Sequence, residues 1–320
     1  MMKRIVSILL FITITLTGCA KYEMEVPYFR EDSVKQYNPA LQADVGVAEF
    51  YSRDLIVISL EDEEEDEFIT ATSSLLVNLT DNKVIYADDI YKRMYPASIT
   101  KLITALVVVE EGNLEDTVTI SKNATNILEP GALLCGFKEG DKINLKDLLS
   151  VFLIYSGNDA GIALAEHISG SEEEFVNTMN ETVKRLGAVH SNFVNPHGLH
   201  DEEHYTTAYD LYLIFNEILK YDEIISIINQ TSCTVDYTRA DGSVRNHQFM
   251  NTNRYLTGRA DAPEDITVIG GKTGTTQAAG NCLILYSVDN SQNEYISVVL
   301  QANGGNNLYK QMTYLLNKIE

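Results

Sequence analysis

The sequence predicts an α/β fold in which a mostly antiparallel sheet is flanked by helices and carries a helical subdomain. Short apolar segments separated by turn residues occur near both ends of the chain, at 74–86 and 232–301, as is typical of paired strands. Between them, from about 113 to 230, apolar residues recur at helical spacing. One segment, 102–109, is almost wholly apolar, which indicates a helix buried in the middle of the domain.

The first residues have the layout of a secretory signal peptide, which we expect to span residues 1–18. Two basic residues, Lys3 and Arg4, precede an uncharged and mostly apolar run that ends at Thr17. This run is too short for a permanent membrane span. Residues 16–19 (Leu-Thr-Gly-Cys) resemble the bacterial lipobox. That resemblance implies a diacylglycerol group on Cys19 and an extracytoplasmic lipoprotein anchored to the bacterial cell membrane.

A tether, a strand with an acidic run, and a hairpin are predicted between the signal peptide and the buried helix. Residues 19–50 show no sustained periodicity and are predicted to be a tether, so the folded domain is expected over 51–320. This domain opens with a predicted strand at 55–60 and an acidic run at 61–67, which is typical of a solvated loop. A hairpin over 74–86, with turn residues at its centre, then leads to the helix.

The buried helix begins near Pro96, where a missing N–H costs nothing, and Gly112 ends it. Ser98 and Lys101 are three residues apart and project from one face of the first turn, so the amine can reach the hydroxyl. This geometry suits a serine nucleophile with a lysine base. The free N–H groups of a helix start also suit a substrate oxygen that gains negative charge. No other Ser-x-x-Lys pair occurs in the sequence.

A helical subdomain is predicted from about 113 to 230. Its first part is rich in turn residues and is expected to be irregular. Four helices are then predicted in succession, beginning near Leu145, Asp159, Glu172 and Thr207.

Ser156 and Asn158 stand on the tight loop between the first two of these helices, with Asp159 as the predicted N-cap of the second. The Ser-x-Asn pattern is weak alone, because 121–123 and 291–293 share it. The pair at 156–158 is preferred because its loop follows an apolar helix, whereas the other two lie in polar turn regions.

Strands are predicted again after Asn229. A hairpin turns at 240–243, and a strand at 266–271 is predicted to end where Lys-Thr-Gly begins, at 272–274. This is the only Lys-Thr-Gly in the chain. Two further strands at 283–288 and 295–301, and a final helix over 308–319, complete the domain.

Composition excludes several classes of function. The 320 residues, 45% of them apolar, can bury a large core. The net charge of −22 leaves no basic stripe to neutralise phosphates, so no nucleic-acid partner is expected. Beyond Cys19 there are three cysteines, Cys135, Cys233 and Cys282, an odd number without metal-like spacing. No cluster such as H-E-x-x-H occurs, so neither a metal nor another cofactor is expected.

Three motifs occur in a fixed order: S-x-x-K at 98–101, S-x-N at 156–158 and K-T-G at 272–274. Together they form the signature of β-lactamases and penicillin-binding proteins. With the runs at 195–199 and 204–211, the sequence over about 70–319 resembles the serine-type D-alanyl-D-alanine carboxypeptidases, the low-molecular-mass penicillin-binding proteins. The resemblance implies a β-lactamase/DD-peptidase-like fold. That family often carries a second, β-rich C-terminal domain, which is not expected here, and Cys19 would replace the C-terminal membrane attachment of many relatives.

The resemblance implies acyl transfer on peptidoglycan stem peptides and acylation by β-lactam antibiotics. Ser98 would attack the carbonyl of the penultimate D-alanine, with a neutral Lys101 as base. Ser156 would pass the proton to the leaving amine, and Asn158 would orient Lys101 and the substrate amide.

The K-T-G segment would bind substrate, with Lys272 and Thr273 on its terminal carboxylate and Gly274 in the same segment. The N–H groups of Ser98 and Thr275 would form the oxyanion hole. Burial of Lys101 beside Lys272 is expected to lower its pKa.

Two alternatives stay open, a β-lactamase of the same fold and a catalytically idle lipoprotein that binds cell-wall peptides. The intact motifs argue against the idle binder. A class A β-lactamase carries an E-x-x-L-N run before its K-T-G. The most similar run here begins at Glu174, which is predicted to lie on a solvated helix face. A Ser-His-Asp triad with His197 or His204 lacks the G-x-S-x-G elbow, so both are interpreted as loop structure.

Overall fold

The computed structural model describes Ile56 and residues 66–319. The predicted signal peptide, Cys19 and the tether lie outside the described residues, as do the strand predicted at 55–60, apart from Ile56, and most of the acidic run. Among the helices that the structure describes, none has the length and apolar character needed to cross a membrane.

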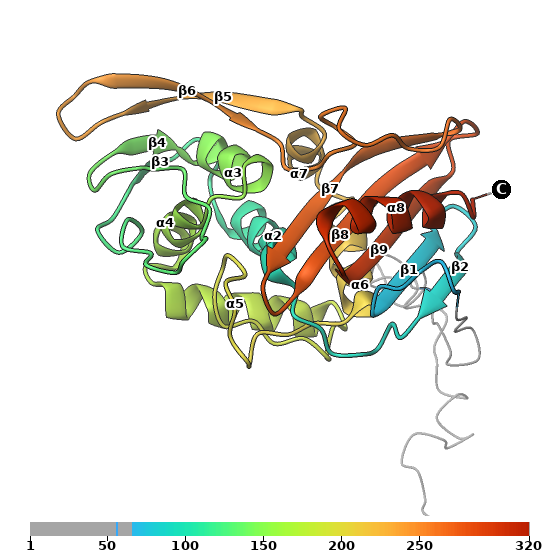
Figure 1. The fold of residues 1–320 in the computed structure, drawn as a ribbon. Helices are drawn as coiled ribbons and strands as arrows, with labels where there is room; N and C mark the ends of the chain where they lie inside the picture. The colour runs from blue at the N-terminus through green and yellow to red at the C-terminus, as the bar shows by residue number, and fades with distance from the viewer. Residues whose placement is uncertain (1–55, 57–65, 320) are drawn as a thin grey trace, which may run out of the picture. The chain divides into compact units, whose positions relative to one another are not determined.

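The main sheet has five antiparallel strands and is built from both ends of the described chain (Figure 1). The strand order is β2-β1-β9-β8-β7, so the N-terminal hairpin pairs with the last strand of the C-terminal group. The strands are β1 (Ser73–Asn78), β2 (Lys83–Asp88), β7 (Ile266–Thr276), β8 (Gly280–Asp289) and β9 (Glu294–Ala302). The predicted α/β class, with a mostly antiparallel sheet flanked by helices, is therefore confirmed.

Helices cover both faces of this sheet, because successive strand residues point to opposite sides. On β1, Leu76 faces a core shared with α8 (Gly305–Leu316), where Met312 is fully buried. Its neighbour Leu75 faces the larger core, which includes Phe215 of α6 (Ala208–Ile218). The sheet thus lies between α8 and the helical part of the domain (Figure 1).

The central helix α2 (Lys101–Glu111) is buried from its first residue to Val108, as the apolar run predicts. It begins later than expected, because a short 3₁₀ turn, η5 (Ala97–Thr100), precedes it. Ala97 has a φ of +47°, in the left-handed region, so a regular α-helix cannot start there. Gly112 follows the last helical residue, as predicted.

Five helices lie between residues 145 and 228, where four were predicted; the additional one is the short last helix of the five. The helices are α3 (Leu145–Ile154), α4 (Asn158–Ser169), α5 (Glu172–Arg185), α6 and α7 (Asp222–Ile228). Side chains of Asn144, Ser171 and Thr207 cap α3, α5 and α6 by accepting backbone N–H groups of the first turn. Thr207, near which a helix was predicted to begin, caps α6 by accepting the backbone N–H of Asp210.

The hairpin predicted around 240–243 forms, but it belongs to a second sheet rather than the main one. Its order is β3-β4-β5-β6. The strands are β3 (Thr117–Thr119), β4 (Lys142–Asn144), β5 (Ser232–Thr238) and β6 (Val244–Met250). Two three-residue strands within the irregular segment supply β5 with a partner, through the pair Ile143–Tyr237. Strands this short carry no periodicity that could be detected in the sequence.

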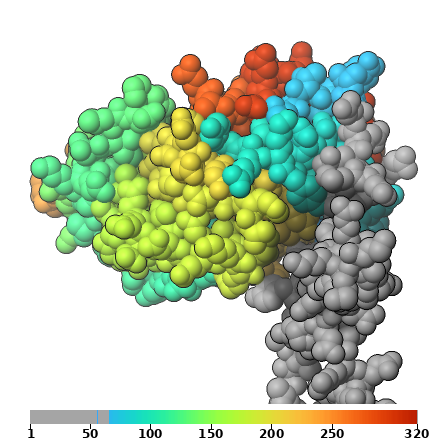
Figure 2. Space-filling view, turned by 90° about the horizontal axis from the view of Figure 1, so that it is seen from below, coloured from blue at the N-terminus to red at the C-terminus, as the bar shows by residue number. Residues whose placement is uncertain are grey.

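The connection between α5 and α6 lies beside the segment that enters η5. Met94 and Thr206 form a two-way backbone pair, with N···O distances of 2.7 and 2.9 Å. In Figure 2 the yellow-green side chains of α5 and its following connection lie next to the teal segment between β2 and α2. Ser98 is thus fixed between an apolar helix and a long connection.

Candidate active site

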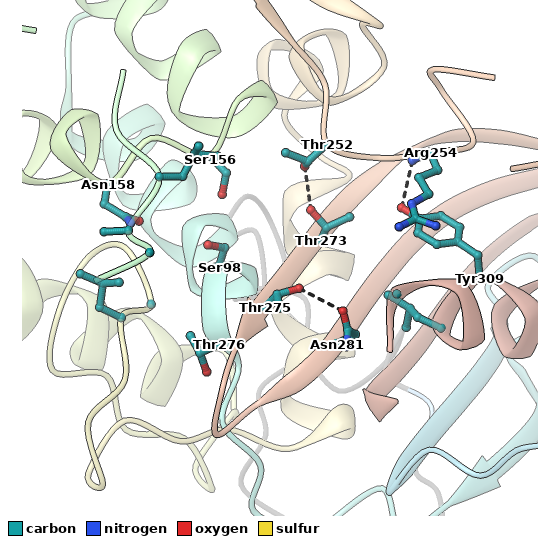
Figure 3. A pocket seen from close by; sticks show the side chains of 17 residues that line it. Ser98, Ser156, Asn158, Thr252, Arg254, Thr273, Thr275, Thr276, Asn281 and Tyr309 are labelled. Atoms are coloured by element: carbon teal, nitrogen blue, oxygen red, sulfur yellow. Dashed lines mark hydrogen bonds between the residues drawn. The ribbon is translucent and has the colours of Figure 1, made fainter. Parts of the chain in front are cut away.

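Ser98 lies at the junction of the sheet and the helical part, on η5 in front of α2 (Figure 3). Its side chain is half-buried and lines a pocket of about 270 Å³. Ser156 and Asn158 stand on one side of it and the end of β7 on the other. The pocket wall includes Ser98, Leu133, Ser156, Asn158, Leu199, Thr252, Arg254, Thr273, Thr275 and Tyr309.

Lys101 is fully buried behind Ser98 and contacts three oxygen atoms. Its Nζ lies 3.1 Å from Ser98 Oγ, 2.7 Å from Asn158 Oδ1 and 2.6 Å from the His197 carbonyl oxygen. Burial, and next the charge of Lys272, hold the pKa of Lys101 well below its ordinary value. The expected direction of this shift is therefore confirmed, with burial as the larger cause.

These three contacts fit a neutral amine. A neutral amine has two N–H donors and one lone pair, and two of the three partners, Asn158 Oδ1 and the His197 carbonyl, can only accept. Both donors are therefore used by fixed acceptors. In the neutral amine the lone pair is left for Ser98, whose hydroxyl lies 3.1 Å away and can donate as well as accept.

Ser156 and Lys272 form a second pair beside the first. Lys272 Nζ lies 3.1 Å from Ser156 Oγ and 3.1 Å from the carbonyl oxygen of the next residue, Thr273. Complete burial lowers the pKa of Lys272 to about 7. Ser156 has a φ of +73°, so its backbone is held in a strained conformation at the site.

The loop that carries Ser156 and Asn158 is tied to a neighbouring loop rather than capped as predicted. Gly157, not Asp159, is the N-cap of α4. The Asp159 carboxylate instead accepts the backbone N–H groups of Cys135 and Gly136, at 2.9 and 3.0 Å. Asp159 lies inside the first turn, where its side chain reaches outward to these donors. The N-cap prediction for Asp159 is therefore wrong.

The K-T-G segment is part of β7, whereas the sequence predicted a strand that ends before it. Pairing with β8 continues through Thr276 and Gly280, so the strand carries Thr273 and Thr275 into the pocket wall. Lys272 and Gly274 lie behind this wall. A Cβ atom at Gly274 would lie 2.7 Å from the Pro96 carbonyl oxygen, so only glycine lets β7 approach η5 this closely.

Arg254, Thr252 and Tyr309 also line the pocket and were missed by the sequence analysis. Arg254 is the one charged side chain among the lining residues, and its guanidinium stacks over Tyr309 at 5.0 Å from the ring centroid. Thr252 Oγ1 lies 2.6 Å from Thr273 Oγ1 (Figure 3). A single arginine in a polar connection carries no motif, and only the fold brings it to β7.

The two candidate histidines do not contact Ser98. His204 Nε2 lies 2.7 Å from Thr100 Oγ1, and the ring is buried. His197 is also buried, and its Nδ1 accepts the N–H of Leu199. Their structure agrees with the interpretation as parts of the connection and gives no support to a Ser-His-Asp triad.

The arrangement can perform acyl transfer by a serine. It contains a hydroxyl next to a buried amine that is held ready to accept a proton. A second hydroxyl beside a second amine lies across the same pocket. Arg254 gives the far end of the pocket a positive charge that suits a carboxylate.

Comparisons with known proteins agree with this chemistry. Residues 60–304 match the family model described as D-alanyl-D-alanine carboxypeptidase. The D-alanyl-D-alanine carboxypeptidase DacF of Bacillus subtilis is 35% identical over 77% of this chain and 61% of its own length. DacA of Haemophilus influenzae is 32% identical over 72% of this chain and 57% of its own length. The chain thus spans about three fifths of the length of these relatives.

A solved structure shares the fold. The Streptomyces K15 DD-transpeptidase superposes with a TM-score of 0.73, covering 80% of this chain and 98% of its own, at 24% sequence identity. Its likeness extends over the sheet and the helical part together.

Proposed function

The chain belongs to the D-alanyl-D-alanine carboxypeptidase family, and from this premise we propose that it removes the terminal D-alanine of peptidoglycan stem peptides through an acyl-serine intermediate. We further propose that β-lactam antibiotics acylate the same serine. The observation that carries the proposal is the contact of the buried Lys101 amine with Ser98 Oγ at 3.1 Å.

In the first step, Ser98 Oγ attacks the carbonyl carbon of the penultimate D-alanine while its proton moves to Lys101 Nζ. A protonated lysine could not accept this proton. The lowered pKa of Lys101 therefore removes a barrier that an exposed lysine would impose at neutral pH. Asn158 and the His197 carbonyl keep the amine aimed at Ser98 in the neutral state.

The leaving amine needs a proton as the tetrahedral intermediate collapses. Ser156 Oγ lines the pocket and is in contact with Lys272 Nζ. Lys272, with a pKa of about 7, can supply a proton through this hydroxyl. The proton that Lys101 took from Ser98 is then released to solvent and Lys272 takes one up, so that both amines return to their starting states. Ser156 is thus the proposed proton donor to the departing D-alanine.

The substrate is held at both ends of the reacting centre. The N–H groups of Ser98 and Thr275 are the proposed oxyanion hole, in which one donor contributes about 3 kcal/mol to the transition state. We assign the terminal carboxylate to the Thr273 hydroxyl and the Arg254 guanidinium, both of which line the pocket. Lys272 does not line the pocket, so in this proposal it acts on the carboxylate through its charge and not by direct contact. Gly274 allows β7 to approach η5 closely.

The proposal is tested by incubating the purified protein with a pentapeptide stem and measuring released D-alanine. We expect steady release by the wild type and none by Ser98→Ala, whose melting temperature should stay close to that of the wild type. An idle cell-wall binder would retain the peptide without releasing D-alanine, and that result would reject the proposal.

Penicillin separates a carboxypeptidase from a β-lactamase of the same fold. Glu174 is exposed on the first turn of α5 and does not line the pocket, so the described pocket offers no carboxylate to activate water on the ester. We therefore expect labelled penicillin to form a long-lived adduct on Ser98. Rapid, continuous hydrolysis of penicillin without peptide cleavage would instead identify a β-lactamase.

The cellular location is proposed from the sequence. The lipobox-like run at 16–19 supports cleavage before Cys19 and a lipid anchor in the cell membrane. A tether after this anchor would let the catalytic domain reach the peptidoglycan outside the membrane.

A further inference from the structure

The residue before the nucleophile has a strained backbone. Ala97 has a φ of +47°, a conformation that alanine rarely adopts. Asparagine and aspartate can stabilise such a conformation with their own side chains, but alanine has no polar side-chain atom. The conformation of Ala97, and with it the direction of Ser98, must therefore be held by other residues.

The carbonyl group of Ala97 is enclosed by two neighbours. Its oxygen accepts a hydrogen bond from Thr100 Oγ1 at 2.8 Å. Gly198 presses against the same carbonyl, because a Cβ atom at position 198 would lie 1.9 Å from the oxygen. The turn therefore depends on the Thr100 hydroxyl and on the connection that carries Gly198.

Thr100 is in turn fixed by His204, whose Nε2 lies 2.7 Å from Thr100 Oγ1. The Nδ1 atom of His204 accepts the backbone N–H of Val194 at 3.1 Å, which leaves the ring proton on Nε2 in a neutral histidine. His204 therefore donates to Thr100, and the single hydroxyl proton of Thr100 is directed to the Ala97 carbonyl.

The surroundings of His204 keep it in this state. The ring is buried, with the Phe193 ring edge-on at 5.3 Å between centroids. Burial lowers the pKa of His204 to about 4, with Asp201 opposing the shift and Lys101 and His200 adding to it. The imidazole is therefore neutral at neutral pH, as the donor chain requires.

We propose that His204 is a positioning residue for the nucleophile: through Thr100 it locks the carbonyl of Ala97 and so aims Ser98 Oγ at Lys101 Nζ. The two-way pair of Met94 and Thr206 fixes the same connection on the other side of the turn. This inference rests on the proposed function, because Ser98 is the nucleophile there.

Two substitutions separate the positioning role from general stability. In His204→Gln, the amide nitrogen can take the place of Nε2 and donate to Thr100, but the acceptor for Val194 is lost. In His204→Asn, the amide oxygen can take the place of Nδ1, but the donor to Thr100 is lost. We expect His204→Asn to lower the rate of acylation of Ser98 by labelled penicillin on the order of tenfold or more. His204→Gln should retain most of the rate.

Thr100 provides the matching pair of variants. Thr100→Val removes the hydroxyl at nearly constant shape, and Thr100→Ser keeps it. We expect Thr100→Val to slow acylation as much as His204→Asn does, and the double variant to be no slower than either single variant, because both break one chain of contacts. Melting temperatures of all variants are measured alongside the rates.

Two results would overturn the proposal. One is equal loss of rate and of melting temperature in His204→Asn and His204→Gln, which would indicate a purely structural histidine. The other is additive loss in the double variant. If the wild type itself is not labelled by penicillin, the proposed function fails instead, and the positioning is then read from amide hydrogen exchange at Ser98 and Ile99. That exchange should be faster in His204→Asn than in His204→Gln.

Discussion

Lys101 and Lys272 are two buried amines that are placed to carry out different proton transfers. Each has a lowered pKa because burial removes its ammonium from water. The charge of Lys272 lowers the pKa of Lys101 further. The consequence is that Lys101 is available in its neutral form to accept the proton of Ser98, whereas Lys272, with a pKa of about 7, is partly protonated at neutral pH and can donate a proton when the amine departs.

Replacing Lys272 tests this division through the pH profile of acylation. Protonated Lys101 cannot accept the Ser98 proton, so the rate rises as pH rises through the pKa of Lys101. Lys272→Met removes the charge that lowers this pKa, so the pKa should increase and the ascending limb should move to higher pH. The acylation rate by labelled penicillin is measured across the acid range.

Lys272→Arg is the control, because it keeps a cation at the same position. Its ascending limb should stay close to that of the wild type. If the ascending limb of the pH profile does not move in Lys272→Met, or moves to lower pH, the charge of Lys272 does not lower the pKa of Lys101 as proposed.

At the residue scale, the sequence predicted the groups that have a local pattern. Ser98 and Lys101 are fixed three residues apart, so helical geometry alone brings them within reach. Arg254 and His204 have no such pattern. Arg254 contacts Tyr309, which is 55 residues away in the sequence, and His204 contacts Thr100, which is 104 residues away. Local sequence patterns do not predict contacts over such separations.

At the scale of elements, the site depends on how closely β7 can approach η5. Gly274 has no side chain, and the space beside it is filled by the backbone of Pro96 and Ser98. The strand therefore brings Thr273 and Thr275 to the nucleophile without a gap. This close approach of two backbones is the structural reason for the glycine in Lys-Thr-Gly.

Gly274→Ala should damage the site more than the fold. The added Cβ would lie 2.7 Å from Pro96 O and 3.1 Å from Ser98 N, and backbone must move to admit it. We expect a loss of about 1–3 kcal/mol in the free energy of unfolding, as in other overpacked sites. The acylation rate should decrease on the order of a hundredfold, because Ser98 and the pocket wall are displaced. Denaturant unfolding and penicillin labelling measure the two effects.

Thr267→Ala is the matched control on the same strand. Thr267 is exposed near the start of β7, so its truncation should change the free energy of unfolding by no more than about 0.5 kcal/mol. Its acylation rate should equal that of the wild type. A Gly274→Ala variant that acylates as fast as Thr267→Ala would show that the close approach is not needed.

The elements that the sequence predicted well are those with a strong period or a clear cap. The apolar run of α2 and the start of α6 at its cap Thr207 are examples. The extension of β7 through Lys-Thr-Gly was missed, because the three glycines of β7 weaken the strand signal, while pairing with β8 still holds the strand. The left-handed Ala97 was also missed, since it follows from contacts with Thr100 and Gly198.

At the scale of the whole molecule, the net charge of −22 bears on how the protein stays at the membrane. Anionic membrane surfaces attract basic segments and repel acidic ones. The net charge of this chain therefore opposes its attraction to an anionic membrane surface. The proposed lipid on Cys19 is the means of attachment that the lipobox-like run at 16–19 supports.

Replacing Cys19 tests this attachment in cells. In the wild type we expect the mature N-terminal peptide to begin at Cys19 and to carry the mass of a diacylglycerol group, with the protein in the membrane fraction. Cys19→Ala removes the sulfur to which this lipid would be attached, so the variant should lose the modification and leave the membrane fraction or remain unprocessed.

Cys233→Ala, at a buried position on β5, is the control for loss of a cysteine as such and should stay lipidated. Mass spectrometry of the N-terminal peptide and fractionation of cells and medium decide the matter. An unmodified wild-type terminus, or wild-type protein found mainly in the medium, would contradict the anchor while leaving the chemistry of Ser98 untouched.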